Sequence, residues 1–246
     1  ETFKILEEAG VPKGVINLVT AKDPRPVGEE FVSNPKVAKL TFTGSTAVGK
    51  MLAGKAAANM KRVSCELGGH APFMVFEDAN PVHAAKGAQL VKFLNTGQAC
   101  ISPNRMYVAE KLVDDFVGTL QERVSKMKAG NGFEEGVTIG PLVNEAAVAK
   151  VETQVEDAKA QGAEVVCGGE RLTTGDLGKG HFFAPTVLNG VTPEMRIYRE
   201  ETFGPVAPVI PFADEREALA LANDTHYGLA AYVYTRDIAR AMRMFE

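Results

Sequence analysis

The chain has 246 residues, of which 45% are hydrophobic and 24% charged, a composition typical of a globular protein with one large or two modest domains. Its net charge of −4 argues against a general nucleic-acid-binding surface, which would be basic. No apolar run approaches the ~20 residues that a membrane-spanning helix needs, so we expect no membrane partner.

The cysteines and histidines restrict the chemistry further. Cys65, Cys100 and Cys167 are too few and too widely spaced for a disulfide framework, and the four histidines show no metal-ligand spacing. We therefore expect a protein of a reducing compartment, the cytoplasm, without a metal site.

Apolar runs typical of strands alternate with helical patterns along the chain. Expected strands lie at 15–20, 38–43, 62–67, 72–77, 104–109, 163–168, 182–188, 205–212 and 230–235. Expected helices lie at about 45–59, 80–94, 111–127, 145–161 and 214–223. This alternation predicts an α/β protein with largely parallel strands.

The ends of the chain and one glycine pair predict its organisation. The first ten residues, ETFKILEEAG, are typical of the end of a helix, and the last ten, DIARAMRMFE, belong to another helical pattern. We expect the chain to be a segment of a longer protein. The sequence GGH separates two strand-like runs near residues 68 to 70, which predicts a first part, residues 1–68, and a second part, residues 69–246.

A strand followed by a glycine-containing turn and a helix is predicted at TFTGSTAVGKM, residues 41–51. Such a turn directs backbone N–H groups toward an anion. The pattern is nearly a P-loop, but Met51 stands where a Ser or Thr would ligate Mg²⁺, and Thr46 stands where a dinucleotide motif would have its second Gly. Phosphate binding and an ordinary capped helix start therefore both remain open on these residues alone.

Two further stretches carry side chains suited to catalysis. Glu66 ends an apolar strand and is followed by two glycines, which places it at the carboxyl end of a strand, where open α/β sheets have their sites. It is either a general base or a solvated glutamate. Cys100 follows a helix in the loop NTGQAC, where a thiolate can attack a carbonyl. A fourth stretch, REETFGPVAPV at 199–209, has two glutamates, an aromatic and Gly-Pro before an apolar strand, and alone it is compatible with a simple turn.

Taken together and in this order, TFTGSTAVG, ELGG, NTGQAC and EETFGPV resemble the signatures of the NAD(P)⁺-dependent aldehyde dehydrogenase superfamily. The resemblance covers practically the whole chain. The stretches at 136–152, 165–169 and 222–237 are similar to the succinate-semialdehyde dehydrogenase branch in particular. The fold implied is the end of a Rossmann-like cofactor domain, residues 1–68, followed by an incomplete α/β catalytic domain, residues 69–246.

The resemblance implies a role for each motif. Cys100 would be the nucleophile that forms a thiohemiacetal and then a thioester, and Glu66 would activate the water that releases the acid. The residues implied to bind NAD or NADP are Thr43, Gly44, Ser45, Val48, Gly49, Leu67, Glu201 and Phe203. Among these, Glu201 would hold the nicotinamide ribose and Phe203 would pack beside the nicotinamide. The partners implied are a small aldehyde substrate and further copies of the chain, as a homodimer or homotetramer.

Two departures from the family pattern affect these expectations. Family members are considerably longer, and the missing upstream part would carry an oxyanion-hole asparagine and the adenosine-ribose contacts, so we expect this segment alone to be inactive. The semialdehyde branch usually has an arginine at the position of Leu94 to bind the substrate carboxylate, and leucine cannot do so.

Three alternatives follow from these departures and from the scaffold. An uncharged aliphatic aldehyde would suit Leu94. A CoA-acylating aldehyde dehydrogenase would transfer the thioester to CoA, although such enzymes typically lack the glutamate found here at Glu66. A non-catalytic protein on the same scaffold is the third, and the joint presence of Cys100, Glu66 and Glu201 argues against it.

Overall fold

The computed structural model describes residues 1–245. Contacts within the chain divide it into two compact units, Glu1–Leu67 and Gly68–Glu246. Every helix in residues 1–245 is too short or too polar to cross a bilayer.

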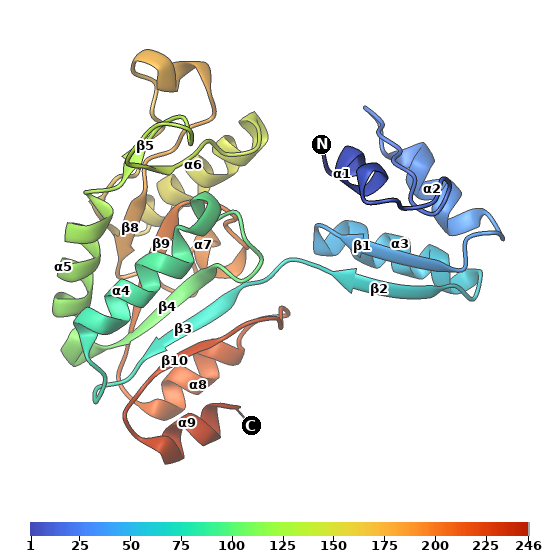
Figure 1. Ribbon diagram of the computed structural model, residues 1–246. Coiled ribbons are helices and arrows are strands. Elements are labelled where there is room, and N and C mark those ends of the chain that lie inside the picture. The colour runs from blue at the N-terminus through green and yellow to red at the C-terminus, as the bar shows by residue number, and fades with distance from the viewer. Residues whose placement is uncertain (246) are drawn as a thin grey trace. The chain divides into compact units, whose positions relative to one another are not determined.

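The first unit is built around one β-α-β element (Figure 1). Strand β1 (Lys39–Thr43) pairs in parallel with β2 (Arg62–Glu66), and helix α3 (Thr46–Ala58) connects them. Helices α1 (Thr2–Glu8) and α2 (Arg25–Ser33) precede β1. The apolar core consists of Val32, Leu40, Leu52 and Ala56, with Phe42 and Val63 packed against it.

The second unit is a three-layer α/β structure around a six-stranded sheet with the order β10-β3-β4-β9-β8-β7. Neighbouring strands are parallel except for β7 and β8. The strands are β3 (Ala71–Val75), β4 (Pro103–Ala109), β7 (Glu164–Cys167), β8 (Thr186–Asn189), β9 (Val206–Phe212) and β10 (Tyr232–Tyr234), and a separate pair is formed by β5 (Lys128–Ala129) and β6 (Val137–Ile139). The prediction of an α/β fold with largely parallel strands is confirmed.

Helices cover both faces of this sheet (Figure 1). Helices α4 (Pro81–Lys92) and α5 (Val113–Val124) pack on the face to which β3 contributes Phe73 and Val75. Helices α6 (Glu145–Ala160), α7 (Arg196–Arg199) and α8 (Glu215–Asn223) pack on the other face, with Met74 and Phe76. The strand is buried on both sides, which explains its continuous apolar sequence. The remaining elements are α9 (Ile238–Phe245) and the short helices η1 (Leu94–Gly97), η2 (Glu110–Leu112) and η3 (Gly175–Lys179).

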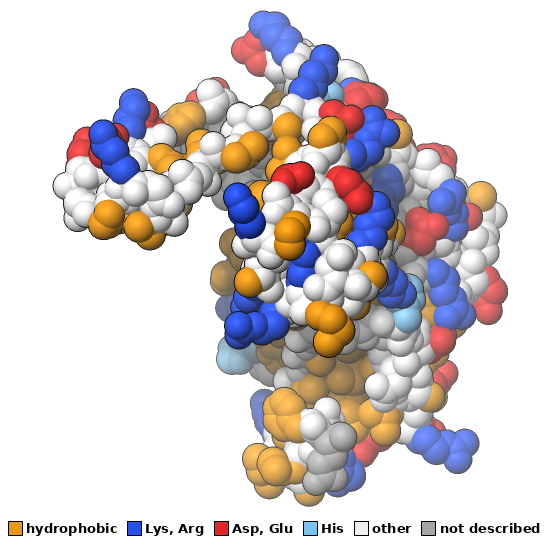
Figure 2. Space-filling model, turned by 90° about the vertical axis from the view of Figure 1, so that its right-hand side faces the viewer, with side chains coloured by type: hydrophobic (Ala, Val, Ile, Leu, Met, Phe, Trp, Pro, Cys, Tyr) orange, Lys and Arg blue, Asp and Glu red, His pale blue; other side chains and the backbone are white. Residues whose placement is uncertain are grey.

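Two expected strands differ from the structure. Residues 15–20 are irregular, because no neighbouring strand within residues 1–245 takes up their backbone hydrogen bonds, and the apolar side chains there are exposed. Hydrophobic side chains are interspersed with charged ones on the face seen in Figure 2. The run at 182–188 enters the sheet only from Thr186, since Phe183 makes an isolated bridge with Arg171 instead.

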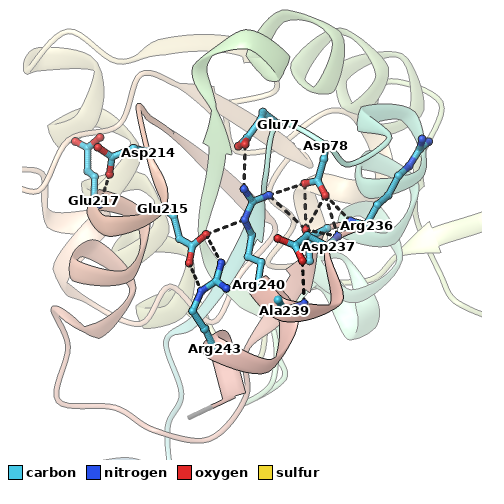
Figure 3. A network of polar contacts seen from close by, with 11 residues as sticks. Glu77, Asp78, Asp214, Glu215, Glu217, Arg236, Asp237, Ala239, Arg240 and Arg243 are labelled. Atoms are coloured by element: carbon cyan, nitrogen blue, oxygen red, sulfur yellow. Dashed lines mark hydrogen bonds and ion pairs between the residues drawn. The ribbon is translucent and has the colours of Figure 1, made fainter.

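A cluster of charged side chains fastens α9 to the second unit (Figure 3). The guanidinium of Arg240, whose side chain is 14% exposed, pairs with Glu77 at 3.0 Å, Asp78 at 2.7 Å and Glu215 at 2.9 Å. Hydrogen bonds from Arg243 and Arg240 lower the pKa of Glu215 to about 2. Burial alone would raise the pKa of Asp78, but the N–H of Arg236, the hydroxyl of Thr235 and the charge of Arg240 together lower it.

Replacing Arg240 by methionine should therefore loosen α9 at neutral pH. Arg240→Met leaves three carboxylates without their shared partner, and we expect a loss of about 2 kcal/mol in local stability, the scale of charged hydrogen bonds. The effect should shrink below pH 4.5, the ordinary value for Glu215, because a lowered pKa stabilises the fold only where the carboxylate is ionised.

Amide hydrogen exchange of residues 238–245 between pH 7 and acid conditions measures this difference. Arg236→Met is the matched control, because only the backbone N–H of Arg236 contacts the cluster. Equal exchange rates in both variants would contradict the assigned role of Arg240.

Candidate active site

The turn between β1 and α3 is shaped to receive an anion. Gly44 donates its N–H to the carbonyl of Glu66 at 3.0 Å, which fixes the turn against the end of β2. Ser45 is the N-cap of α3, and its hydroxyl accepts from the N–H of Val48 at 3.4 Å. The hydroxyl of Thr46 is buried and has no partner among the described residues. A helix N-terminus with a free hydroxyl suits phosphate oxygens.

Glu66 and Leu67 lie beside this turn in the same unit. Thr43 is the register partner of Glu66, so the two residues end parallel strands side by side. Burial alternates along β2, with Cys65 half-buried and Glu66 exposed. A Cβ on Gly49 would collide with the side chain of Leu67, so the helix approaches this segment closely. The first unit thus gathers the predicted cofactor residues of TFTGSTAVG, together with Glu66 and Leu67.

In the second unit, a strained turn precedes Cys100. Asn95, Thr96 and Gly97 have φ values of 49°, 61° and 75°, the left-handed region that costs a β-branched residue such as threonine about 1–3 kcal/mol. Gly97 tolerates this φ, and it also lacks the Cβ that would strike the carbonyl of Gly204. The strain persists only because the surrounding structure imposes it.

The segment at 140–143 holds this turn through two side chains. The hydroxyl of Thr96 accepts from the N–H of Gly140 at 2.9 Å and donates to its carbonyl at 3.2 Å. The amide of Gln98 accepts from the N–H of Val143 at 2.9 Å and donates to the carbonyl of Pro141 at 3.2 Å. We call these four residues of the chain, Gly140, Pro141, Leu142 and Val143, the bracing segment.

Cys100 itself is half-buried in the turn that follows. Its backbone N–H has no acceptor among the described residues, so it is free to bind an oxyanion. The next residue, Ile101, accepts at its carbonyl a hydrogen bond of 2.9 Å from the hydroxyl of Tyr232 on β10. The turn is therefore fixed both before and after the thiol.

Glu201 and Phe203 lie close to the same turn. The N–H of Gly69 donates to Oε1 of Glu201 at 2.9 Å, while no donor within residues 1–245 reaches Oε2. Gly69 itself must be a glycine, because a Cβ there would collide with the carbonyl of Cys100. Phe203 has a φ of 51° and is 38% exposed, and the hydroxyl of Thr202 is buried with no hydrogen-bond partner in the part of the chain that the structure describes.

These features fit a nicotinamide cofactor. In the second unit taken by itself, the carboxylate of Glu201 can accept from ribose hydroxyl groups, and the exposed ring of Phe203 can pack on a planar base. In the first unit taken by itself, the α3 turn can bind phosphates. The assignment of the individual residues to the cofactor stays a prediction. Within residues 1–245, no group of three or more His, Cys, Asp or Glu side chains is arranged to hold a metal ion.

His70 is buried next to this site. Its side chain is 3% exposed, and Nε2 donates to the carbonyl of Tyr198 at 2.6 Å, which leaves Nδ1 without a partner among the described residues. Burial lowers the pKa of His70 to about 4, although the hydrogen bond to Tyr198 acts in the opposite direction. The imidazole is therefore neutral near pH 7.

The motifs did not reveal all the residues that shape the site. Thr96 and the bracing segment were missed, because neither a threonine before Gly97 nor the sequence GPLV signals a left-handed turn. Lys92 and Asn104 were also missed, and they are buried beneath the turn that carries Cys100.

Comparison with known proteins gives a consistent result. The model of the aldehyde dehydrogenase family matches residues 1–246. The chain is 50% identical to succinate-semialdehyde dehydrogenase [NADP(+)] of Escherichia coli K12, over 97% of this chain and 48% of that protein. It is 49% identical to glutarate-semialdehyde dehydrogenase of Pseudomonas aeruginosa, over 99% of this chain and 49% of that protein.

A solved structure agrees with these relatives. The crystal structure of succinate-semialdehyde dehydrogenase from Burkholderia pseudomallei superposes with a TM-score of 0.95 and 51% identity, over 99% of this chain and 49% of that one. The chain thus spans about half the length of the curated relatives it matches.

The strained turn makes a prediction about Thr96. Thr96→Val keeps the branched side chain but removes the hydroxyl that the N–H of Gly140 needs, whereas Thr96→Ser keeps the hydroxyl and reduces the crowding. One lost hydrogen bond of about 1 kcal/mol should speed amide exchange at Gly140 roughly fivefold in the valine variant. Exchange at Gly140 should stay slow in the serine variant, and fast exchange in both or in neither would refute the bracing role.

Proposed function

The chain belongs to the aldehyde dehydrogenase family, and from this premise we propose that the whole protein oxidises a small semialdehyde to its carboxylic acid with NAD⁺ or NADP⁺. The observation that carries the proposal is the turn that presents Cys100, which is strained, braced by residues 140–143 and close to the carboxylate of Glu201. Strain that the surrounding structure imposes is concentrated at functional sites.

Cys100 is the proposed nucleophile. Its sulfur, as the thiolate, bonds to the aldehyde carbon, and the carbonyl π electrons move to oxygen to give a thiohemiacetal oxyanion. The N–H of Cys100, which has no acceptor among the described residues, is the proposed donor to that oxyanion. A bound nicotinamide cofactor would supply the acceptor for the hydride that leaves the former aldehyde carbon. Cys100 then holds the product as a thioester.

Glu66 is the proposed general base for release of the acid. Its carboxylate takes a proton from water, the hydroxide oxygen bonds to the thioester carbon, and the carbon–sulfur bond breaks to return the thiolate. Exposure of Glu66 at the end of β2 supports this role, because the side chain can reach water.

The cofactor residues form two groups in the proposal. Thr43, Gly44, Ser45, Val48, Gly49 and Leu67 belong to the first unit, and Glu201 and Phe203 to the second. We assign residues 1–68 to the cofactor domain and residues 69–246 to the catalytic domain. The Escherichia coli relative is named for NADP(+), and the choice between NAD⁺ and NADP⁺ here is open.

Several properties of the whole protein complete the proposal. It acts as a cytoplasmic homodimer or homotetramer, as its resemblance implies. The 246-residue chain alone does not turn over aldehyde, because it spans about half of its relatives and loss of a single oxyanion donor already costs about 10²–10³ in rate.

Leu94 favours a second candidate, the oxidation of an uncharged aliphatic aldehyde. Its side chain is 54% exposed six residues before Cys100, and Ile101 directly after the thiol is also exposed. An apolar surface next to the nucleophile does not bind a carboxylate. The semialdehyde hypothesis therefore requires a cation from elsewhere in the whole protein to bind the substrate carboxylate.

The chemistry is tested with Glu66→Gln in the whole protein. Acylation of Cys100 should survive, so we expect a burst of one reduced cofactor per active site, followed by turnover about 100-fold slower than in the parent because the general base is lost. Stopped-flow absorbance of the reduced cofactor measures both phases, with Cys100→Ala as the control that shows no burst.

Two outcomes of this experiment would contradict the proposed role of Glu66 or favour an alternative acceptor. Unchanged steady turnover in Glu66→Gln would exclude Glu66 as the base, and restoration of turnover by added CoA alone would favour the CoA-acylating alternative.

The substrate is tested with succinate semialdehyde against butanal, each with NAD⁺ and NADP⁺. We expect a preference of the parent for the semialdehyde, and we expect Leu94→Arg to increase that preference about tenfold, as one charge-assisted hydrogen bond permits. Leu94→Met is the control that keeps an apolar side chain. A parent that prefers butanal would replace the semialdehyde reading with the second candidate.

A further inference from the structure

Lys92, the last residue of α4, has a fully buried side chain with an exposed fraction of 0%. Its ammonium nitrogen Nζ donates to Oδ1 of Asn104 at 2.9 Å. Among the described residues, no carboxylate lies within ion-pair distance of it. Buried lysines are rare and costly unless they are paired, so this one needs an explanation.

Hydrogen bonds connect Lys92 to the contact between Gly69 and Glu201 and to the turn that carries Cys100. Asn104, which accepts from Lys92, lies with its Nδ2 at 3.5 Å from the carbonyl of Gly69, and the N–H of Gly69 donates to Glu201. Gly69 also abuts the carbonyl of Cys100. The backbone carbonyl of Lys92 accepts from the hydroxyl of Ser102 at 3.2 Å. A single residue, Asn104, thus separates Lys92 from Gly69, whose N–H donates to Glu201.

The charged groups around Lys92 differ in whether they change state near neutral pH. Burial lowers the pKa of Lys92 to about 7, and the charge of Glu201 acts in the opposite direction. His70, with a pKa of about 4, is neutral in this range, and the guanidinium of Arg105 stays charged. The net charge of Lys92 and Glu201 together therefore changes from zero to −1 as the pH rises through about 7.

Lys92 is too buried to touch a substrate, and its amine is already held by Asn104. A role as general acid or base on the aldehyde is therefore excluded by its position. What remains is an electrostatic effect on the group that Glu201 contacts.

We propose that Lys92 is a positioning residue of the cofactor site, whose buried positive charge disfavours the oxidised nicotinamide relative to the reduced one. The proposal rests on the function proposed above, because it takes Glu201 as the carboxylate at the nicotinamide ribose. The oxidised ring carries one positive charge more than the reduced ring, so a nearby ammonium penalises it. When Lys92 loses its proton, Glu201 is left uncompensated and the oxidised form gains affinity.

The test measures binding of both cofactor forms to the whole protein in a Cys100→Ala background, which removes turnover and the thiol proton. The measured quantity is the ratio of the Kd for the oxidised cofactor to the Kd for the reduced one. Groups that act equally on both forms, such as a cofactor 2′-phosphate, cancel in this ratio. We expect the ratio to fall about tenfold between about pH 6 and about pH 8.5, the size of effect that a unit charge about 12 Å away gives at an effective dielectric constant of about 20.

Three variants separate charge from structure. Lys92→Gln keeps a donor for Asn104 without the charge, Lys92→Met removes both, and Lys86→Met is the control, since Lys86 is an exposed lysine on the same helix. We expect the glutamine and methionine variants to show, at both pH values, the low Kd ratio that the parent shows only at the higher pH. The Lys86 variant should follow the parent.

Calorimetry on the parent supplies a readout that needs no variant at Lys92. Titration near pH 7 in two buffers of different ionisation enthalpy should show more proton release with the oxidised cofactor than with the reduced one, because binding and protonation are reciprocally linked. Equal proton release with both forms would overturn the proposal.

The remaining outcomes are also decisive. If the ratio depends on pH in Lys92→Gln as it does in the parent, a group other than Lys92 titrates and the proposal fails, while the proposed function stands. If the parent binds neither cofactor form, the proposed function and this inference fail together.

Discussion

The contact between Gly69 and the carbonyl of Cys100 constrains the rest of the second unit. Two backbones can approach this closely only where one residue has no Cβ. To hold the carbonyl of Cys100 there, the chain before it must turn sharply after α4, which it does through the left-handed residues 95–97. The bracing segment and the hydroxyl of Tyr232 then fix the turn on either side. The hydrogen bonds that fix the turn therefore also maintain its strained backbone conformation.

Two buried cations lie next to this contact, Arg105 on β4 and Lys92 at the end of α4, and their hydrogen bonding differs. All five N–H groups of Arg105 are used, two each by the carbonyl of His70 and by residues at the end of α8, and one by the hydroxyl of Tyr107. Such complete hydrogen bonding makes a buried guanidinium tolerable. Lys92, which bonds Asn104 of the same strand, has one acceptor for three possible donors. Arg105 is therefore explained by the architecture, whereas Lys92 is explained better by the site.

The sequence predicted the parts of the structure that depend on local pattern. The helices at α3, α4, α5, α6 and α8 and the central strands follow from hydrophobic periodicity and from caps such as Ser45. Residues 15–20 failed because strand propensity alone is insufficient without a neighbour to complete the hydrogen bonds. The short strands β5 and β6, of two and three residues, were below what a pattern can indicate.

The site divides in the same way. The motifs around Gly44, Glu66, Cys100 and Glu201 are local sequences, and each was recognisable without a structure. Contacts between distant segments were not, because Thr96 meets Gly140 across 44 residues and Gly69 meets Glu201 across 132. A lysine in the last turn of a helix normally faces solvent, where it complements the helix dipole. Only tertiary packing shows that Lys92 is buried.

This burial bears on the departure at Leu94. A cation that binds a substrate carboxylate must reach solvent on the substrate side, and neither buried cation near Cys100 can do so, since Arg105 and Lys92 are both fully enclosed. The positive charges close to the nucleophile therefore act on the protein's own groups and on Glu201 in particular. On the function proposed above, the charge of the substrate and the charge of the cofactor would be recognised by different residues, so that a change at Leu94 would alter the choice of aldehyde while the electrostatics around Glu201 remain as they are.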